Sequence, residues 1–212
     1  LSIIKNVSDY VYVTCDGVGE GETMSIYTID DSYKIKKIWT NFYPNSIGLF
    51  YSTITDYLGF EINEGEFKVM SLSSFGEPVY EKEIKEIFNI DNFTINMDYF
   101  EFHKSPIKSF SKKLCEVFGD PYLNINKEEN FKKYANIASS AQLILEHTMK
   151  NLIQKAIELS GKRKIVLTGG VALNCKMIHN LSKKNIFEEL IVPPSPGDSG
   201  SAIGAANFAF LN

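Results

Sequence analysis

A glycine pair lies between an apolar run that resembles a β-strand and a segment whose residues are compatible with a helix. Residues 165–176 read IVLTGGVALNCK, in which Gly169 and Gly170 follow the run IVLT. Glycine accepts positive φ and can close a tight turn at such a junction. A glycine pair that opens a helix also leaves backbone N–H groups bare beside the positive end of a helix dipole, where a phosphate can bind. The pattern by itself leaves both roles open.

Two aspartates and an asparagine stand at similar junctions. Asp16 ends an apolar run and precedes Gly17, and its residue type favours a turn-forming aspartate. Asp198 follows a Pro-Gly turn in the loop SPGD and favours the N-cap of the last helix. Asn174 lies early in a predicted helix, where its side chain can simply bond the backbone. No Walker loop and no GxGxxG stretch competes with these sites.

The composition is that of an ordinary globular protein and excludes several classes of function. The 212 residues can bury a sizeable core, and 44% are hydrophobic and 23% charged. The formal net charge of -4 gives no general attraction to nucleic acid or to anionic lipid. We therefore expect a protein that acts on a small molecule, and we do not expect nucleic acid as a partner.

The cysteines and the chain start bear on the compartment. Cys15, Cys115 and Cys175 are far apart and form no CxxC arrangement, so the sequence indicates neither a disulfide framework nor a zinc site. No apolar run reaches membrane-spanning length, and the first residues lack the features of a signal peptide. We expect a cytoplasmic protein. The missing initiator methionine predicts a piece of a longer protein.

The first 60 residues predict a meander followed by a helix. The runs YVYVTCDG, TMSIYTID and YKIKKIWTNFY are separated by short glycine-rich or polar links and predict three antiparallel strands. Ser46 is the expected N-cap of the next helix and Gly59 its stop. Apolar residues recur at helical spacing between them, at Ile47, Phe50, Ile54 and Leu58. The stretch NEGEFKVMSLSSFGEPVY after it predicts a loop that carries a short helix.

The rest of the chain predicts an insertion, a long helix and a parallel end. Residues 81–133 show no clear period and are expected to pack over the core as an insertion. Residues 134–160 predict a long helix, with apolar positions at Ile137, Ala141, Ile144, Met149, Leu152, Ala156 and Leu159. The runs KIVLTGG, ALNCKMIHNLSKK, ELIVPP and SGSAIGAANFAFL then alternate strand and helix, which predicts parallel pairing.

These elements predict a single α/β domain in three parts. Residues 1–80 supply the meander, helix and loop, residues 81–160 the insertion and long helix, and residues 161–212 a parallel βαβα end. This order is the one found in a single lobe of the actin, Hsp70 and sugar-kinase superfold, which is ribonuclease H-like. The resemblance implies a mixed sheet with a mostly helical insertion.

Five local stretches add a more specific resemblance. DGVGEGETMSIY, NSIGLFYSTITDYLGF, GEFKVMSLSSFG, TGGVALNCKM and PPSPGDSGSAIGAA follow one another in this order. Each resembles, in the same succession, a motif of the O-carbamoyltransferases of antibiotic-tailoring (tobramycin carbamoyltransferase-like) and nodulation type. The match runs from about Tyr12 to the end of the chain, with a loose insertion.

The resemblance implies a two-domain, ATP-dependent transferase. In such enzymes a C-terminal, YrdC-like domain converts carbamoyl phosphate and ATP into carbamoyl adenylate. An N-terminal, actin-like domain then passes the carbamoyl group to an acceptor hydroxyl. This chain resembles mainly the second lobe of that N-terminal domain. The expected partners are therefore a small-molecule acceptor, carbamoyl phosphate, the other lobe and the YrdC-like domain, and the isolated chain is expected to be inactive.

The resemblance also implies a metal centre. It makes Asp16 and Asp198 the carboxylate ligands of one divalent metal, with iron the expected ion, which would hold or polarise the carbamoyl carbonyl. The family's HxxxH pair lies shortly before the aspartate of the DGxG stretch, but no histidine precedes Asp16 here. We therefore expect an incomplete site of two oxygen ligands at most.

Further residues are expected around the nucleotide of the carbamoyl adenylate. The resemblance implies that Gly17 and Gly19 let the hairpin backbone approach phosphate or substrate. It implies that Gly169 and Gly170 expose N–H groups to the nucleotide while closing the turn. The same resemblance implies that Asn174 contacts the nucleotide. Two residues of the GEFKVM stretch, Glu66 and Lys68, are candidates for the polar wall of the same pocket. The alternative is that they are simply solvated, as charged residues on a loop usually are.

Two other functions share part of this pattern. Threonylcarbamoyl transfer to tRNA uses a related fold and part of the glycine motif, although the acidic net charge gives it no support. The lobe could also be a nucleotide-binding module without catalysis, or part of a sugar kinase. Binding of tRNA with steep salt dependence would favour the first alternative.

Overall fold

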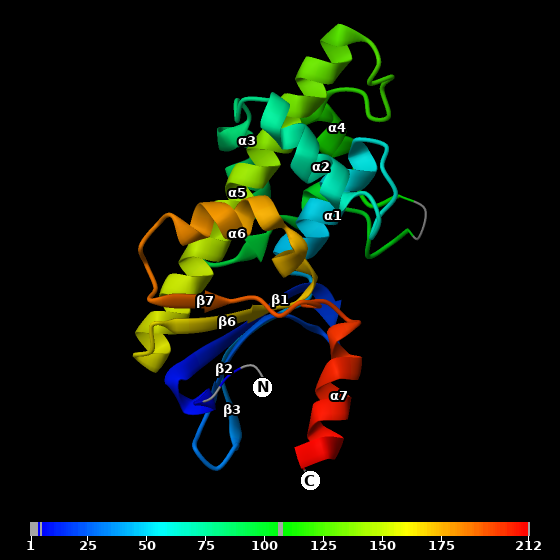
Figure 1. Cartoon of the computed structure of the whole chain (residues 1–212). Helices are drawn as coiled ribbons and strands as arrows, with labels where there is room; N and C mark the ends of the chain where they lie inside the picture. The colour runs from blue at the N-terminus through cyan, green and yellow to red at the C-terminus, as the bar shows by residue number, and fades with distance from the viewer. Residues whose placement is uncertain (1–3, 5, 106–107, 212) are drawn as a thin grey trace. The chain divides into compact units, whose positions relative to one another are not determined.

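The computed structural model describes residues 4, 6–105 and 108–211, and the chain divides into two compact units (Figure 1). The first unit consists of Leu1–Tyr43 and Lys150–Asn212, and the second of Pro44–Met149. Helix α5 (Glu128–Ser160) contributes its earlier turns to the second unit and its last turns to the first. Each unit is described by itself.

The first unit is built on a five-stranded mixed sheet of order β3-β2-β1-β6-β7. Strands β1 (Tyr10–Gly19), β2 (Glu22–Ile29) and β3 (Ile35–Phe42) form the predicted antiparallel meander. Strands β6 (Lys164–Thr168) and β7 (Glu189–Ile191) continue the sheet in parallel, as the strand and helix alternation predicts. The parallel pairing thus places Thr14, in the middle of β1, opposite Thr168, the last residue of β6.

Side chains of alternate residues build the core of this sheet. Seven apolar residues of β1, β2 and β6 are completely buried: Val11, Val13, Cys15, Met24, Ile26, Ile165 and Leu167. They follow the two-residue period of a strand, so they share one face of the sheet. This face anchors β1 against β6 and fixes where both strands end.

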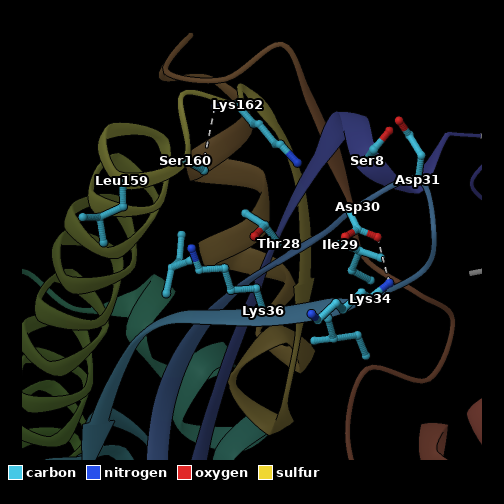
Figure 2. A pocket seen from close by; sticks show the side chains of 12 residues that line it. Ser8, Thr28, Ile29, Asp30, Asp31, Lys34, Lys36, Leu159, Ser160 and Lys162 are labelled. Carbon is cyan, nitrogen blue, oxygen red and sulfur yellow. Dashed lines mark hydrogen bonds between the residues drawn. The ribbon is translucent and has the colours of Figure 1, made fainter.

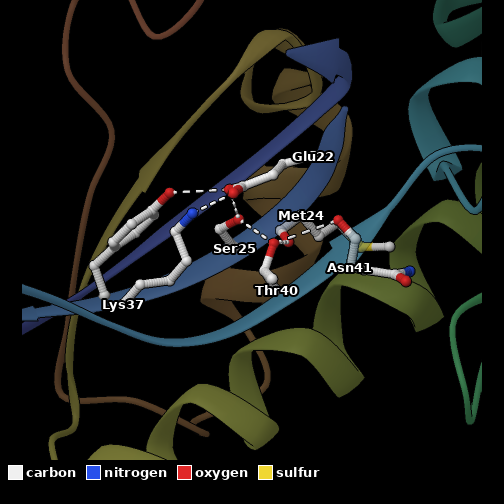
Figure 3. A network of polar contacts seen from close by, with 7 residues as sticks. Glu22, Met24, Ser25, Lys37, Thr40 and Asn41 are labelled. Atoms are coloured by element: carbon white, nitrogen blue, oxygen red, sulfur yellow. Dashed lines mark hydrogen bonds and ion pairs between the residues drawn. The ribbon is translucent and has the colours of Figure 1, made fainter. Parts of the chain in front are cut away.

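A polar network links β2 and β3 (Figure 3). The Glu22 carboxylate accepts hydrogen bonds from Ser25 Oγ at 2.7 Å and from Tyr27 Oη at 3.3 Å, and it is paired with Lys37. Ser25 Oγ also lies 2.8 Å from Thr40 Oγ1. The hydrogen bond from Lys37 is the main cause that lowers the pKa of Glu22. The network ties the hairpin together by its side chains.

The helices of the first unit follow β6 and β7. After β6 comes a 3₁₀ turn (η4, Gly170–Leu173) and then α6 (Cys175–Ser182), so the glycine pair does not open the α-helix directly as the sequence suggested. Helix α7 (Gly200–Leu211) ends the chain and leaves the sheet toward the C-terminus in Figure 1. Ile203 on this helix is 53% exposed.

The second unit is mainly helical. Helix α1 (Ile47–Tyr57) matches the prediction: Ser46 Oγ accepts a hydrogen bond from the Leu49 N–H at 3.0 Å, and Gly59 has φ +83°. All four predicted apolar positions of α1 and its cap are buried. The following loop carries the short helix α2 (Glu66–Leu72) and the 3₁₀ turn η2 (Ser73–Phe75).

The insertion is more regular than its sequence suggested. It contains α3 (Glu81–Ile87), β4 (Phe88–Asn89), β5 (Thr94–Ile95), the 3₁₀ turn η3 (Met97–Tyr99) and α4 (Lys112–Phe118). Helix α5 begins at Glu128 and not at residue 134, because its first turn is polar and hides the helical period. Its predicted apolar positions are buried except Leu159, which is 50% exposed in the last turn. Among the helices that the structure describes, none is both long and apolar enough to cross a bilayer.

Candidate functional site

Gly169 follows the last residue of β6 and lies against Cys15 in the middle of β1. This residue has φ +95° and ψ 162°, a conformation that is open almost only to glycine. A Cβ atom at this position would lie 2.1 Å from the carbonyl oxygen of Cys15. Glycine is therefore required here twice, by its own backbone and by the close approach of β1.

Asp16 is clamped by backbone N–H groups from two segments. Its Oδ1 accepts a hydrogen bond from the Gly17 N–H at 2.8 Å, and its Oδ2 accepts one from the Gly170 N–H at 3.0 Å. Asp16 and Gly170 are 154 positions apart in the sequence. The carboxylate is half-buried, which strengthens these charge-assisted bonds.

The loop that carries Asp198 reaches the same glycine pair. The Gly169 N–H donates to the carbonyl oxygen of Pro196 at 2.7 Å, and Pro196 is buried. A Cβ atom on Gly197 would lie 3.9 Å from the Cα of Gly170. The segments that carry Asp16 and Asp198 therefore both contact the turn at Gly169 and Gly170.

Asp198 itself is exposed and differs from its predicted capping role. Helix α7 begins at Gly200, so Ser199 occupies the position before the first helical residue. The Asp198 carbonyl oxygen accepts hydrogen bonds from the Ser201 N–H at 3.0 Å and from Ser201 Oγ at 2.6 Å. Asp198 thus lies one residue before the N-cap position at which it was predicted, and it contacts the start of α7 through its backbone carbonyl.

The two N–H groups predicted to face a nucleotide both donate within the protein. The Gly170 N–H is bonded to Asp16, and the Gly169 N–H to Pro196. A phosphate that binds here through these groups would have to displace or share the bonds with the oxygens of Asp16 and Pro196. Asn174 has the alternative role named above: its Oδ1 accepts from the Met177 N–H at 2.9 Å and caps α6.

The DGxG hairpin departs from regular strand pairing next to Asp16. The register of β1 against β2 shifts between Cys15 and Gly19, and Gly19 then pairs with Glu22. Such an irregularity bends a strand and re-aims the side chains within it. No described atom lies within 4 Å of a Cβ built on Gly19, so the backbone of the hairpin is accessible on that side.

A metal site at Asp16 and Asp198 would need their carboxylates together with other ligands. Each carboxylate oxygen has two lone-pair sites, so an aspartate that accepts hydrogen bonds can also bind a cation. Asp198 adds a second carboxylate from the neighbouring loop. Within residues 4, 6–105 and 108–211, no group of three or more His, Cys, Asp or Glu residues could hold a metal ion. A divalent cation held by Asp16 and Asp198 would therefore need ligands beyond those that the described residues supply.

Cys15 is adjacent to Asp16 but is no nucleophile. Its side chain is completely buried. Burial, and secondarily the charge of Asp16, raises the pKa of the Cys15 thiol. The thiol stays protonated at neutral pH, and its role is packing beneath the site.

Glu66 and Lys68 lie on α2 in the second unit. Glu66 Oε1 accepts hydrogen bonds from Ser52 Oγ at 2.8 Å and from the Asn63 N–H at 3.1 Å. Lys68 is exposed, and its Nζ lies 5.7 Å from the ring centroid of Phe60 and 5.9 Å from that of Phe67. In this unit Glu66 thus stabilises the start of a helix, and Lys68 covers aromatic rings.

An open hollow of about 730 Å³ lies in the first unit, away from the predicted site residues (Figure 2). It is lined by Ser8, Thr28, Ile29, Asp30, Asp31, Lys34, Ile35, Lys36, Ile38, Leu159, Ser160 and Lys162. Ser8 precedes the first residue of β1, whereas Asp16 lies toward the other end of that strand. Asp30 clamps the β2–β3 turn through the N–H groups of Ser32 and Lys34. The hollow contains none of the residues predicted to do chemistry.

Sequence reasoning missed the backbone groups that hold the site together. The carbonyl oxygen of Pro196 and the backbone of Cys15 both contact Gly169. The Pro-Gly turn in SPGD was a signal for a tight loop, but nothing in it points to Gly169. Only the assembled sheet brings these groups together.

The family assignment rests on several comparisons. The family model described as "Carbamoyltransferase N-terminus" matches residues 7–207. An uncharacterized protein of Synechocystis is 34% identical over an alignment of 203 positions, which covers 93% of this chain and 32% of that protein. The nodulation protein NolNO of Sinorhizobium fredii is 26% identical over 196 residues, 92% of this chain and 27% of that protein.

A similar relation holds for an archaeal protein. An uncharacterized protein of Methanocaldococcus jannaschii is 31% identical over an alignment of 220 positions, which covers 97% of this chain and 38% of that protein. The chain thus spans about a third of the length of the curated relatives that it matches. The model match covers nearly the whole chain, and it shows that this chain belongs to the carbamoyltransferase family and corresponds to its N-terminal region.

Proposed function

We propose that the chain is part of an enzyme that passes a carbamoyl group from carbamoyl adenylate to an acceptor hydroxyl. The adenylate would form from carbamoyl phosphate and ATP. The observation that carries the proposal is the meeting of three stretches at one glycine pair: Asp16 of DGxG bonds Gly170, and Pro196 of SPGD bonds Gly169. Three separate motifs that converge on one sheet edge favour a shared site over three independent turns.

Asp16 and Asp198 are the proposed holders of a divalent metal, with iron the proposed ion. When bound, such an ion polarises a carbonyl oxygen and stabilises the charge that develops on it. Asp16 contributes a carboxylate whose two oxygens are each oriented by one N–H donor. Asp198 contributes an exposed carboxylate on a loop tied to Gly169. The remaining ligands would come from segments outside this chain.

The small residues of the same edge are the proposed nucleotide cradle. Gly17 and Gly19 are the proposed points where the hairpin backbone is approached, and a Cβ built on Gly19 meets no described atom within 4 Å beyond its chain neighbours. Gly169 and Gly170 would contribute their N–H groups, while the positions of their missing Cβ atoms lie against Cys15 and Asp16. Asn174 remains a proposed nucleotide contact beside its role as a cap. Glu66 and Lys68 of α2 are the proposed polar wall, with Lys68 supplying a positive charge to phosphate.

The proposed architecture is one lobe of the actin, Hsp70 and sugar-kinase superfold. The order of elements supports it: three antiparallel strands, a helix, an inserted helical unit, and then strand, helix, strand and helix. The chain covers only 32% of the Synechocystis relative. We propose that a second lobe and an activating YrdC-like domain act together with this chain.

Ligand binding to the 212-residue chain tests the cradle. Titration with AMP, followed by ¹⁵N-resolved NMR, should shift the amide resonances of Gly169, Gly170 and Asn174. The amide of Gly161, which follows α5 and lies outside the proposed cradle, is the matched control and should not move. Shifts at Gly161 alone, or none at saturating AMP, would contradict the nucleotide site.

A transfer assay tests the activity itself. A protein that contains this chain together with the further segments should form carbamoyl adenylate from ATP and carbamoyl phosphate and carbamoylate a sugar-like hydroxyl. Asp16→Asn should abolish transfer while leaving adenylate formation intact, because the activating step is proposed to lie elsewhere. A protein that binds both substrates and never forms carbamoyl adenylate argues against this function. Tight tRNA binding with steep salt dependence would instead favour threonylcarbamoyl transfer.

A further inference from the structure

We infer that Gly170 is a positioning residue for Asp16, and that its backbone N–H sets the direction in which this carboxylate presents its remaining lone pairs. The inference rests on the proposed function and adds a role for a residue that was expected to close the turn and to contact the nucleotide. It is carried by one hydrogen bond, at 3.0 Å, between segments 154 positions apart.

The two donors to Asp16 act on different oxygens. Gly17 N–H holds Oδ1 at 2.8 Å, and Gly170 N–H holds Oδ2 at 3.0 Å. One donor on each oxygen fixes both the position and the plane of a carboxylate, whereas a single donor would leave it free to rotate. The Gly17 donor is local to Asp16, whereas the Gly170 donor links the carboxylate to a distant segment.

The absence of a side chain on Gly170 also leaves room for the Asp16 carboxylate. A Cβ atom on Gly170 would lie 2.9 Å from Asp16 Oδ1, closer than real Cβ contacts allow. The φ angle of Gly170 lies outside the left-handed region, unlike that of Gly169. A substitution at Gly170 therefore acts mainly through the Asp16 carboxylate, while one at Gly169 acts through the backbone.

This arrangement makes one N–H common to two proposed subsites. The Gly170 N–H would face a phosphate in the proposed cradle, but it is already bonded to a proposed metal ligand. A ligand oxygen that takes over this N–H releases Asp16 Oδ2. Nucleotide binding and the orientation of Asp16 are then coupled through a single peptide group.

The first arm of the test uses the metal-free 212-residue chain. Amide hydrogen exchange at Gly170 should become at least about tenfold faster in Asp16→Ala than in the wild type, because a charge-assisted bond is lost. In Gly170→Ala the Gly17 amide resonance should shift as Oδ1 is displaced, with an unchanged circular dichroism spectrum. Gly204→Ala on α7 is the control, because no described atom lies within 4 Å of its Cβ position. Unchanged exchange at Gly170 together with an unmoved Gly17 resonance would overturn the positioning role.

The second arm adds Mn²⁺ and separates this inference from the proposed function. In the wild-type chain, bound Mn²⁺ should broaden the amide resonances near Asp16. Gly170→Ala should need about tenfold more Mn²⁺ for the same broadening, because the loss of a residue that orients a metal ligand weakens metal binding by about this factor. Gly204→Ala should behave as the wild type. If the wild type bound no Mn²⁺ while the exchange and resonance changes of the first arm occurred as expected, the proposed metal site would be contradicted. The positioning role of Gly170 would still be supported. Equal Mn²⁺ affinity of wild type and Gly170→Ala would overturn the positioning role.

Discussion

Two carboxylates, one in each unit, are held in different ways. Asp16 accepts hydrogen bonds from Gly17 and from Gly170, which is 154 positions away. Glu66 accepts them from Ser52 and Asn63, which are 14 and 3 positions away. The geometry of Asp16 therefore depends on the assembled sheet, whereas that of Glu66 depends on a short stretch of chain. Damage to the first should spread through its unit, and damage to the second should stay local.

The largest effect is expected at the turn that supports Asp16. Gly169→Ala should lower the free energy of unfolding by about 3–5 kcal/mol, because strain at a glycine-only φ and ψ adds to a backbone overlap. The overlap is with the carbonyl oxygen of Cys15, at 2.1 Å. Urea unfolding of the wild type and Gly169→Ala measures this loss of stability. The matched control Gly204→Ala, in a helix with open space around it, should be neutral or stabilising by up to about 1 kcal/mol. Equal stability of the two variants would break the comparison.

The next effect is expected at Asp16 itself. Asp16→Ala should lower the free energy of unfolding by about 2 kcal/mol, because the N–H groups of Gly17 and Gly170 both lose a charged acceptor. Asp16→Asn should cost less, since the amide oxygen can keep one of these bonds. Urea unfolding of the three proteins checks the order. If Asp16→Ala were as stable as the wild type, the clamp would contribute nothing to the fold.

A smaller and local effect is expected at Glu66. Glu66→Ala should destabilise by about 0.5–1 kcal/mol, because it removes an acceptor for Ser52 and Asn63 and a negative charge from the first turn of α2. Glu66→Gln should recover most of the loss through its amide oxygen. Amide hydrogen exchange should show faster opening of α2 and no change in β1 and β6. Faster exchange across the sheet would contradict a local role.

The smallest effect is expected at Glu22, which shares a sheet with Asp16 but is held by hairpin partners. Its folded-state pKa is lowered, mainly by the hydrogen bond from Lys37. The carboxylate therefore stabilises the fold above its unfolded pKa of about 4.3, and this contribution is lost as the pH falls through the lower folded value. The stability gap between wild type and Glu22→Gln should shrink between pH 6 and pH 3. Because the pair is exposed, 0.5 M salt should also narrow the gap.

Much of the fold could be predicted where the signal is local. The three strands of the meander, the cap at Ser46 and the stop at Gly59 each follow from residues within a short stretch of chain, and the structure confirms them. The start of α5 was wrong, because a polar first turn carries no apolar period. The insertion was underestimated for a similar reason, since its helices are short.

The site was less accessible to sequence reasoning than the fold. The resemblance grouped the stretches around Asp16, Gly170 and Asp198, and the family to which it pointed is confirmed. The contacts between these stretches depend on the pairing of β1 with β6, which joins segments separated by an entire second unit. No local pattern states that the N–H of Gly170 points at Asp16. The roles of these residues in catalysis and binding stay predictions.

The burial of Cys15 gives the chain a built-in reporter of sheet opening. Its thiol is completely buried and its pKa is raised, whereas Cys175 is exposed. A thiol-reactive dye should therefore label Cys175 at once and Cys15 only when β1 separates from its neighbours. The ratio of the two labelling rates follows the integrity of the strand that carries Asp16, in one sample and without an engineered probe.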